Sequence, residues 1–292
     1  MIQAGPTNQV TGRFDPELVE CLPQSLKFIS HNGAGYDQVD AKACIARGTF
    51  PLLETRRINC AHRQMQITYQ RLQLAGISVS NTPKAVDAST ADTAMLLLLG
   101  AIRRIHTPYT AIRAGQWRGA MSLGHDAEGK TLGILGMGGI GNALAKRAQA
   151  FDLKIQYHNR HPVPDEDNVT HAKYVSLEEL FGTSDILSIH LPLSDATRHY
   201  IGKKEFEMMK DGITIINTAR GPIIDEELLV QGLDSGKVYA AGLDVYEKEP
   251  EVHEGLIKSD RVIILPHVGT ATVETQVSNI SSTPARWVDI RV

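Results

Sequence analysis

A glycine pattern at residues 136–141 constrains this 292-residue chain more than any other feature. Gly136, Gly138 and Gly141 stand at G-x-G-x-x-G spacing, between a short apolar run at 131–135 and a stretch with apolar residues at helical spacing, 140–151. In a strand–turn–helix unit the first glycine permits a tight turn, the second lets a pyrophosphate approach the backbone, and the third lets the helix pack on the strand. Amides at the start of the helix supply partial positive charge for the phosphates. The pattern therefore predicts a dinucleotide-binding site.

The residues after the next predicted strand, 153–157, indicate which dinucleotide is bound. A site for NAD carries Asp or Glu there, to accept hydrogen bonds from the ribose 2′-hydroxyl. This chain has His158, Asn159 and Arg160 instead. Because no carboxylate would repel a 2′-phosphate and a guanidinium can bind one, we expect NADP(H) to be preferred, with NAD(H) also possible.

Predicted strands and helices continue to alternate along the rest of the chain. Apolar runs predict strands at 26–30, 76–81, 185–190, 213–217, 239–244 and 261–265, and helical patterns occur at 39–47, 87–104, 176–181, 204–209 and 225–235. This alternation predicts an α/β fold with a Rossmann-type, doubly wound parallel sheet. Ligands of such sheets bind at the carboxyl ends of the strands, so the residues that follow each strand are the candidates for a site.

Composition excludes several classes of partner. A net charge of −3 provides no basic surface for nucleic acid or anionic lipid. The three cysteines, Cys21, Cys44 and Cys60, fit neither a metal-binding spacing nor a disulfide framework. The longest apolar run, 94–102, is too short to span a bilayer. We therefore expect a cytoplasmic protein with no metal, no nucleic-acid partner and no membrane partner.

Three polar residues that follow predicted strands suit redox chemistry. Arg220 follows strand 213–217, Glu249 follows strand 239–244, and His267 follows strand 261–265. Reduction of a 2-oxo acid needs an anchor for the carboxylate, a donor that polarises the carbonyl, and a proton for the developing alkoxide. Arginine binds a carboxylate through its planar fork, and histidine can donate the proton. A glutamate beside the histidine would stabilise the imidazolium and fix its tautomer.

Seven segments carry a resemblance to a known family: HNGAGYDQVD, VSNTPKAVDASTADTAMLLLLGAIR, GKTLGILGMGGIG, SIHLPLSDATRHYIG, INTARGPIIDEELL, AAGLDVYEKEP and ILPHVGT. The order and spacing of these segments resemble those of the D-isomer-specific 2-hydroxyacid dehydrogenases. Within that family, the chain is similar to the glyoxylate/hydroxypyruvate reductases and the fungal D-mandelate dehydrogenase-like enzymes. The resemblance implies a smaller flavodoxin-like substrate domain beside the cofactor domain, and a homodimer formed largely through the cofactor domain.

The resemblance also implies a role for individual residues. Arg220 would bind substrate, Glu249 would pair with the histidine, and His267 would be the acid/base. The amides of Ala34 and Gly35 would help to hold the substrate carboxylate. With the turn glycines, the implied cofactor contacts are Gly136, Gly138, Gly139, Ile140, Gly141, Asn159, Arg160, Leu191, Pro192, Thr197, Thr218, Asp244 and Gly269.

Three features depart from the family. Residues 48–75 look inserted, the chain begins without the opening strand and helix of the substrate domain, and 277–292 are polar and unperiodic where relatives continue with a long helix. We interpret 48–75 and 277–292 as translated intron, the start as truncated or misassigned, and the substrate domain as incomplete. The expected domains are a substrate domain at 1–98, an NAD(P)-binding domain at 99–269, and a tail at 270–292 that is a remnant of the return to the substrate domain.

Several functions fit these observations. The leading hypothesis is NADPH-dependent reduction of glyoxylate or hydroxypyruvate to the D-2-hydroxy acid, with His267 as the proton donor. A D-mandelate-type dehydrogenase is one alternative. A dinucleotide-sensing binding protein is another, because the co-repressors that share this fold keep the Arg, Glu and His. A third is an inactive product of a faulty gene model.

Overall fold

The computed structural model describes residues 2–4, 13–23, 25–26, 28–31, 33–47, 52–53, 72–73, 78–82, 84–118, 121–168 and 170–282. The chain divides into two compact units, Met1–Thr82 with Asn279–Val292, and Pro83–Ser278. From the sequence we placed the division at 98/99. In the structure it falls before helix α3 (Asp87–Arg103), because this helix packs against strands of the second unit.

The first unit contains a three-stranded parallel sheet in the order β1–β2–β5. Its elements are β1 (Ile2–Ala4), α1 (Pro16–Cys21), β2 (Phe28–His31), α2 (Ala41–Ala46) and β5 (Ser78–Ser80). Both helices begin at an aspartate, since Asp15 and Asp40 each accept a hydrogen bond from an amide three residues later at 2.9 Å. A small core that includes Phe14, Val19 and Ile29 holds the unit together.

Two expectations about this unit concern its start and its insert. We expected no opening strand, but β1 pairs with β2 in parallel register. Within 48–75 the structure describes β3 (Leu52–Leu53) and β4 (Leu72–Gln73), which pair antiparallel. The rest of that segment lies outside the described residues, so its interpretation as an insert stays a prediction.

The second unit contains a seven-stranded sheet in which all neighbouring strands are parallel. The order is β12–β11–β10–β9–β6–β7–β8, which confirms the doubly wound sheet. The strands are β6 (Thr131–Leu135), β7 (Lys154–His158), β8 (Lys173–Tyr174), β9 (Ile186–Ile189), β10 (Ile213–Asn217), β11 (Val238–Leu243) and β12 (Val262–Ile264). The order reverses between β6 and β9, so the crevice that binds ligands in such sheets opens there.

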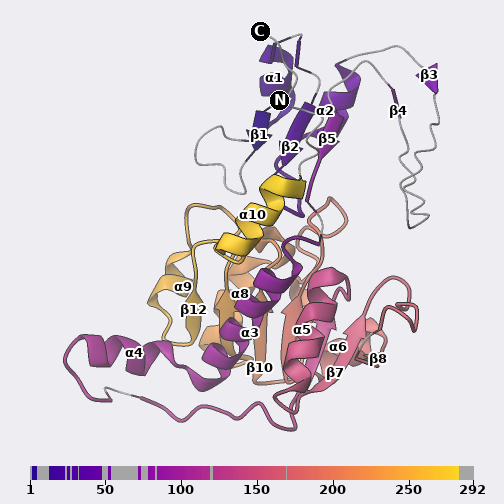
Figure 1. The fold of residues 1–292 in the computed structure, drawn as a ribbon. Coiled ribbons are helices and arrows are strands. Elements are labelled where there is room, and N and C mark those ends of the chain that lie inside the picture. The colour runs from indigo at the N-terminus through magenta and orange to yellow at the C-terminus, as the bar shows by residue number, and fades with distance from the viewer. Residues whose placement is uncertain are drawn as a thin grey trace. The chain divides into compact units, whose positions relative to one another are not determined.

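Helices cover both faces of this sheet (Figure 1). One face packs on α3 and α5 (Gly139–Gln149), and the other packs on α6 (Leu177–Thr183), α7 (Lys203–Met208) and α8 (Glu226–Ser235). Alternate strand residues enter the two cores. On β10, for example, Ile213 and Ile215 join one core and Ile216 joins the other. The apolar strand runs therefore reflect burial on both faces.

Several short elements were not predicted from the sequence. They are α4 (His106–Arg113), β8, the 3-10 helix η1 (Gly221–Ile223), α9 (Glu254–Lys258) and α10 (Val273–Ser282). The expectation of an unperiodic segment from residue 277 onward is wrong as far as Ser282, because α10 continues to that residue. Buried Thr275 anchors α10 through a 3.0 Å hydrogen bond to Ser89 on α3. Residues 283–292 lie outside the described part. No described helix has the length and apolar character needed to cross a bilayer.

Candidate functional site

The glycine turn between β6 and α5 has the geometry that its spacing predicts. Gly136 has a φ of +104°, and a Cβ there would lie 2.8 Å from the carbonyl oxygen of His190. A Cβ at Gly141 would clash with the Gly136 carbonyl, so the first turn of α5 packs directly on the loop. Beside Gly138, in contrast, no atom of the described residues would lie within 4 Å of an added Cβ. Within the described part of the chain, no side chain caps the start of α5. An open turn and unpaired amides fit a diphosphate group.

His190 follows β9 at the point where the strand order reverses. Its Nε2 lies 2.9 Å from Ser188 Oγ, whereas its Nδ1 is buried without a hydrogen-bond partner among the described residues. Burial lowers the pKa of His190 to about 4, so the ring is neutral at neutral pH. Sequence reasoning did not single out His190. The rule that selects residues directly after strands would have reached it.

Of the two residues directly after β7, Asn159 holds the glycine turn and Arg160 faces solvent. Asn159 Oδ1 accepts a 2.7 Å hydrogen bond from the Met137 amide, so this side chain holds the glycine turn in place. Tyr174 Oη donates to the Asn159 carbonyl at 3.1 Å. Arg160 is exposed, and no hydrogen bond or ion pair joins its side chain to the described residues. Its guanidinium therefore stands in solvent at the end of β7.

The loop after β9 is held by its own hydrogen bonds. Thr197 Oγ1 donates to the Pro192 carbonyl at 2.6 Å and accepts from the Ser194 amide at 2.8 Å. Leu191 packs against the core on the α6 side of the sheet. These contacts shape the loop, and they give Thr197 a structural part in it.

The segment after β10 carries Thr218 and Arg220. Asn217 closes this turn, since its Oδ1 accepts from the Ala219 amide and its Nδ2 donates to the Arg220 carbonyl, each at 3.0 Å. Thr218 is buried, and its Oγ1 has no hydrogen-bond partner among the described residues. Buried hydroxyls are normally satisfied, so this one fits contact with a bound molecule. Arg220 Nη1 donates to the Ala219 carbonyl at 2.8 Å.

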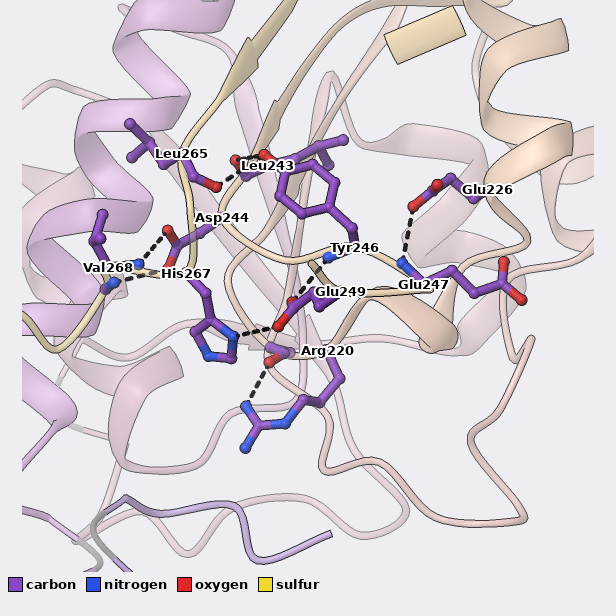
Figure 2. Close-up of polar contacts among 12 residues, drawn as sticks. Arg220, Glu226, Leu243, Asp244, Tyr246, Glu247, Glu249, Leu265, His267 and Val268 are labelled. Atoms are coloured by element: carbon purple, nitrogen blue, oxygen red, sulfur yellow. Dashed lines mark hydrogen bonds and ion pairs between the residues drawn. The ribbon is translucent and has the colours of Figure 1, made fainter. Parts of the chain in front are cut away.

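His267 and Glu249 form a hydrogen-bonded pair. The Nδ1 atom of His267 lies 2.8 Å from Glu249 Oε2, and both side chains are partly buried, with 16 % and 27 % exposed (Figure 2). Glu249 Oε1 accepts a 3.0 Å hydrogen bond from the Tyr246 amide. In Figure 2 the His267 ring and the Arg220 side chain both extend away from Leu243 and Leu265 at the strand ends. The pair could thus present an acid to a bound molecule.

Asp244, at the end of β11, holds the segment that carries the histidine. Its two carboxylate oxygens accept hydrogen bonds from the amides of Val268 and Gly269, each at 2.8 Å. Burial raises the pKa of Asp244, and the two amide hydrogen bonds oppose that shift. His267 itself has a φ of +54°, an uncommon value for a residue with a side chain. Asp244 therefore fixes the backbone immediately after His267.

Gly221 joins the loops that carry Arg220 and Glu249. A Cβ at Gly221 would fall on the carbonyl group of Tyr246, so the loops after β10 and β11 touch backbone to backbone. Glu226 Oε2 accepts a 3.0 Å hydrogen bond from the Glu247 amide and fastens the second loop to α8 (Figure 2). Tyr246 Oη donates to the Leu265 carbonyl at 2.8 Å, and burial raises the pKa of this phenol.

The predicted substrate contacts Ala34 and Gly35 belong to the first unit. There Asn81 Nδ2 donates to the Ala34 carbonyl at 2.6 Å, and Gly33 donates to Thr82 Oγ1 at 3.1 Å. These bonds fix the loop after β2 within that unit. Among the described residues, no group of three or more His, Cys, Asp or Glu side chains is placed to hold a metal ion.

In the second unit the predicted site residues gather at one end of the sheet. The open glycine turn, the uncapped start of α5 and the unpartnered Thr218 hydroxyl fit a dinucleotide across the ends of β6, β9 and β10. Arg220, Glu249 and His267 follow the ends of β10, β11 and β12. One hydrogen bond joins Glu249 to His267, and the Gly221 contact joins the loop of Glu249 to that of Arg220.

Comparison with known proteins places these features in a family. Residues 95–269 match the sequence model described as "D-isomer specific 2-hydroxyacid dehydrogenase, NAD binding domain". The chain is 50 % identical over 274 residues to 4-methyl-2-oxopentanoate reductase A of Aspergillus oryzae, covering 94 % of this chain and 74 % of that protein. The crystal structure of a glyoxylate reductase from Paecilomyes thermophila matches with a TM-score of 0.82 and 48 % identity, covering 96 % and 77 % of the two chains.

A further solved structure was determined with a cofactor. It is the NADPH-dependent glyoxylate/hydroxypyruvate reductase from Sinorhizobium meliloti in complex with NADP and malonate. It matches with a TM-score of 0.78 and 30 % identity, covering 96 % of this chain and 77 % of that one.

Proposed function

Because this chain belongs to the D-isomer-specific 2-hydroxyacid dehydrogenase family, we propose that it uses NADPH to reduce glyoxylate or hydroxypyruvate to the D-2-hydroxy acid. The family consists of oxidoreductases that use a nicotinamide dinucleotide. The observation that carries the proposal is the 2.8 Å contact between His267 and Glu249 at the end of the sheet that bears the glycine turn.

The cofactor, when bound, supplies the hydride that reduces the carbonyl carbon of the substrate. Glu249 accepts a hydrogen bond from His267 Nδ1–H and so fixes the orientation of the ring, leaving Nε2 to donate the proton to the carbonyl oxygen. The Arg220 guanidinium binds the substrate carboxylate and polarises the oxygen beside it. We also propose that the amides of Ala34 and Gly35 bind substrate.

The residues at the end of β7 support a preference for NADP(H). Arg160 is exposed there, and no carboxylate stands among His158, Asn159 and Arg160 to repel a 2′-phosphate. The similar reductase from Sinorhizobium meliloti, whose structure contains NADP, supports the same choice.

A bulkier 2-oxo acid is the second candidate substrate. The relative from Aspergillus oryzae, at 50 % identity, is a 4-methyl-2-oxopentanoate reductase. An assay of NADPH oxidation with glyoxylate, hydroxypyruvate, 4-methyl-2-oxopentanoate and benzoylformate ranks the candidates by kcat/KM. Turnover of the first two above the others supports the proposal. Cofactor binding without turnover of any substrate would favour a dinucleotide-sensing protein instead.

We further propose that the second unit pairs with a second copy in the cytoplasm. Large apolar side chains are exposed on and after α4, with Tyr109 60 %, Trp117 78 % and Leu123 88 % exposed. Such a concentration of exposed apolar residues is typical of a protein–protein interface. Light scattering on the purified protein tests this, since a monomeric mass at micromolar concentration would contradict it.

A further inference from the structure

Asp87, the first residue of α3, places its carboxylate against the N-terminus of α5. Gly139 is the first residue of α5, and a Cβ added there would fall on this carboxylate, 2.7 Å from its Cγ atom. The absence of a side chain at Gly139 thus leaves the room that Asp87 occupies. The contact places a negative group beside the turn whose open face lies at Gly138.

The charge of this carboxylate is poorly compensated. No hydrogen bond to the Asp87 carboxylate is formed by the described residues. Arg147 on α5 is the nearby guanidinium, but it binds Asp92 Oδ1 at 2.5 Å and the Ala88 carbonyl at 3.3 Å. Lys84 is the cation whose charge acts on Asp87. Burial raises the pKa of Asp87, and Lys84 opposes this only in part.

We propose that Asp87 sets the affinity of the site for the cofactor diphosphate, by placing a second negative charge at the helix terminus that binds it. The inference rests on the proposed function, since it takes the start of α5 as the diphosphate site. Two anions that share one helix terminus repel each other. The chain therefore holds the cofactor less tightly than the glycine turn alone would, and releases it faster after hydride transfer.

This arrangement links cofactor binding to a proton. A bound diphosphate favours the protonated form of Asp87, so binding takes up a proton. The affinity for the diphosphate is highest at low pH, where the Asp87 carboxyl group is already neutral. It falls as the pH rises through the range in which Asp87 ionises in the free protein, a range above that of an ordinary aspartate because burial raises this pKa.

The test measures binding of ADP-ribose, which carries the diphosphate but no 2′-phosphate and no nicotinamide. Titration calorimetry on the full chain between pH 5 and pH 8 compares the parent, Asp87→Asn and Asp87→Ser. Asp234→Asn is the matched control, because Asp234 is exposed on α8 and the same charge is removed there. At pH 7.5 we expect both Asp87 variants to bind roughly three- to tenfold more tightly than the parent, as for a partly screened charge pair.

The pH dependence of ADP-ribose binding distinguishes an effect of the Asp87 charge from an effect of its side chain on the structure. The tighter binding of the Asp87 variants relative to the parent should diminish as the pH falls and Asp87 of the parent becomes protonated, while Asp234→Asn follows the parent throughout. The melting temperature of Asp87→Asn at pH 7.5 should be retained or raised, because burial disfavours the charged form in the folded chain. Equal or weaker binding by both Asp87 variants would overturn the inference and leave the proposed function intact. If the parent binds neither ADP-ribose nor NADPH, the proposed function itself fails.

Discussion

His267 Nδ1 lies 2.8 Å from Glu249 Oε2, although the two residues follow different strands of the sheet. The carboxylate engages one ring nitrogen and leaves the other for a ligand. Glu249 is itself held by the Tyr246 amide, so its own position is fixed. The pair thus determines which nitrogen of His267 can deliver a proton.

Replacement of His267 by Ala should abolish most of the chemistry and leave cofactor binding largely unchanged. Loss of a positioned acid lowers kcat by about 10²- to 10⁴-fold. Steady-state kinetics with glyoxylate, together with NADPH titration by fluorescence, measures the two effects separately. His161→Ala, an exposed histidine, is the control. An unchanged kcat in His267→Ala would refute the assigned role.

Glu249→Gln tests the partner of the histidine. The amide keeps the size of the carboxylate but cannot stabilise an imidazolium by charge, so kcat should fall roughly tenfold or more while KM changes less. Glu251→Gln removes an exposed carboxylate two residues away and should behave like the parent. A KM effect with normal kcat would assign Glu249 to substrate binding instead.

Arg160→Asp tests the choice of dinucleotide. Loss of a charge-assisted contact to the 2′-phosphate, and repulsion from the new carboxylate, should lower the ratio of kcat/KM for NADPH over NADH by roughly 10- to 100-fold. Lys146→Asp makes the same charge reversal at an exposed position on α5. Equal kcat/KM for the two cofactors in the parent would contradict the proposed preference.

His190 should make stability depend on pH. Its pKa is about 4 in the folded chain against an ordinary value of 6.5, so the unfolded chain binds more protons between these limits. Stability is therefore fully present above pH 6.5 and is lost as the pH falls towards 4, by on the order of 3 kcal/mol. Urea unfolding between pH 4 and pH 7 measures this loss.

The variant His190→Gln should flatten that dependence, because Gln can still reach Ser188 Oγ but does not titrate. His161→Gln, at an exposed histidine, should keep the slope of the parent. An equal loss of stability in the parent and in His190→Gln would show that other groups cause the acid sensitivity.

Much of the second unit could be predicted because its signals are local. The apolar run at 131–135, the glycines after it and the helical stripe that follows lie next to one another in the sequence, and β6 and α5 formed as expected. The aspartate before α8 and the glycine after it also marked the ends of that helix, since Asp225 accepts from the Leu228 amide and Gly236 has a φ of +81°.

Contacts between segments that lie far apart in the sequence could not be predicted from such local signals. The cofactor contact predicted for Asn159 stays a prediction, but the hydrogen bond from the Met137 amide to its side chain was not foreseen, since it forms only where the carboxyl end of β7 meets the turn after β6. Asp87 and Gly139 meet only once α3 packs on α5. Helix α10 was missed for a similar reason, since its polar sequence is anchored by one buried threonine.

The backbone contact at Gly221 has a consequence for how this site can respond to a ligand. Because the loops of Arg220 and Glu249 press together with no room for a side chain, neither can shift unless the other follows. A molecule that enters meets the backbone before Glu249 already in contact with the backbone after Arg220, so little loop rearrangement is left for the moment of reaction. Even a methyl group at position 221 would push these two loops apart and displace both Arg220 and Glu249.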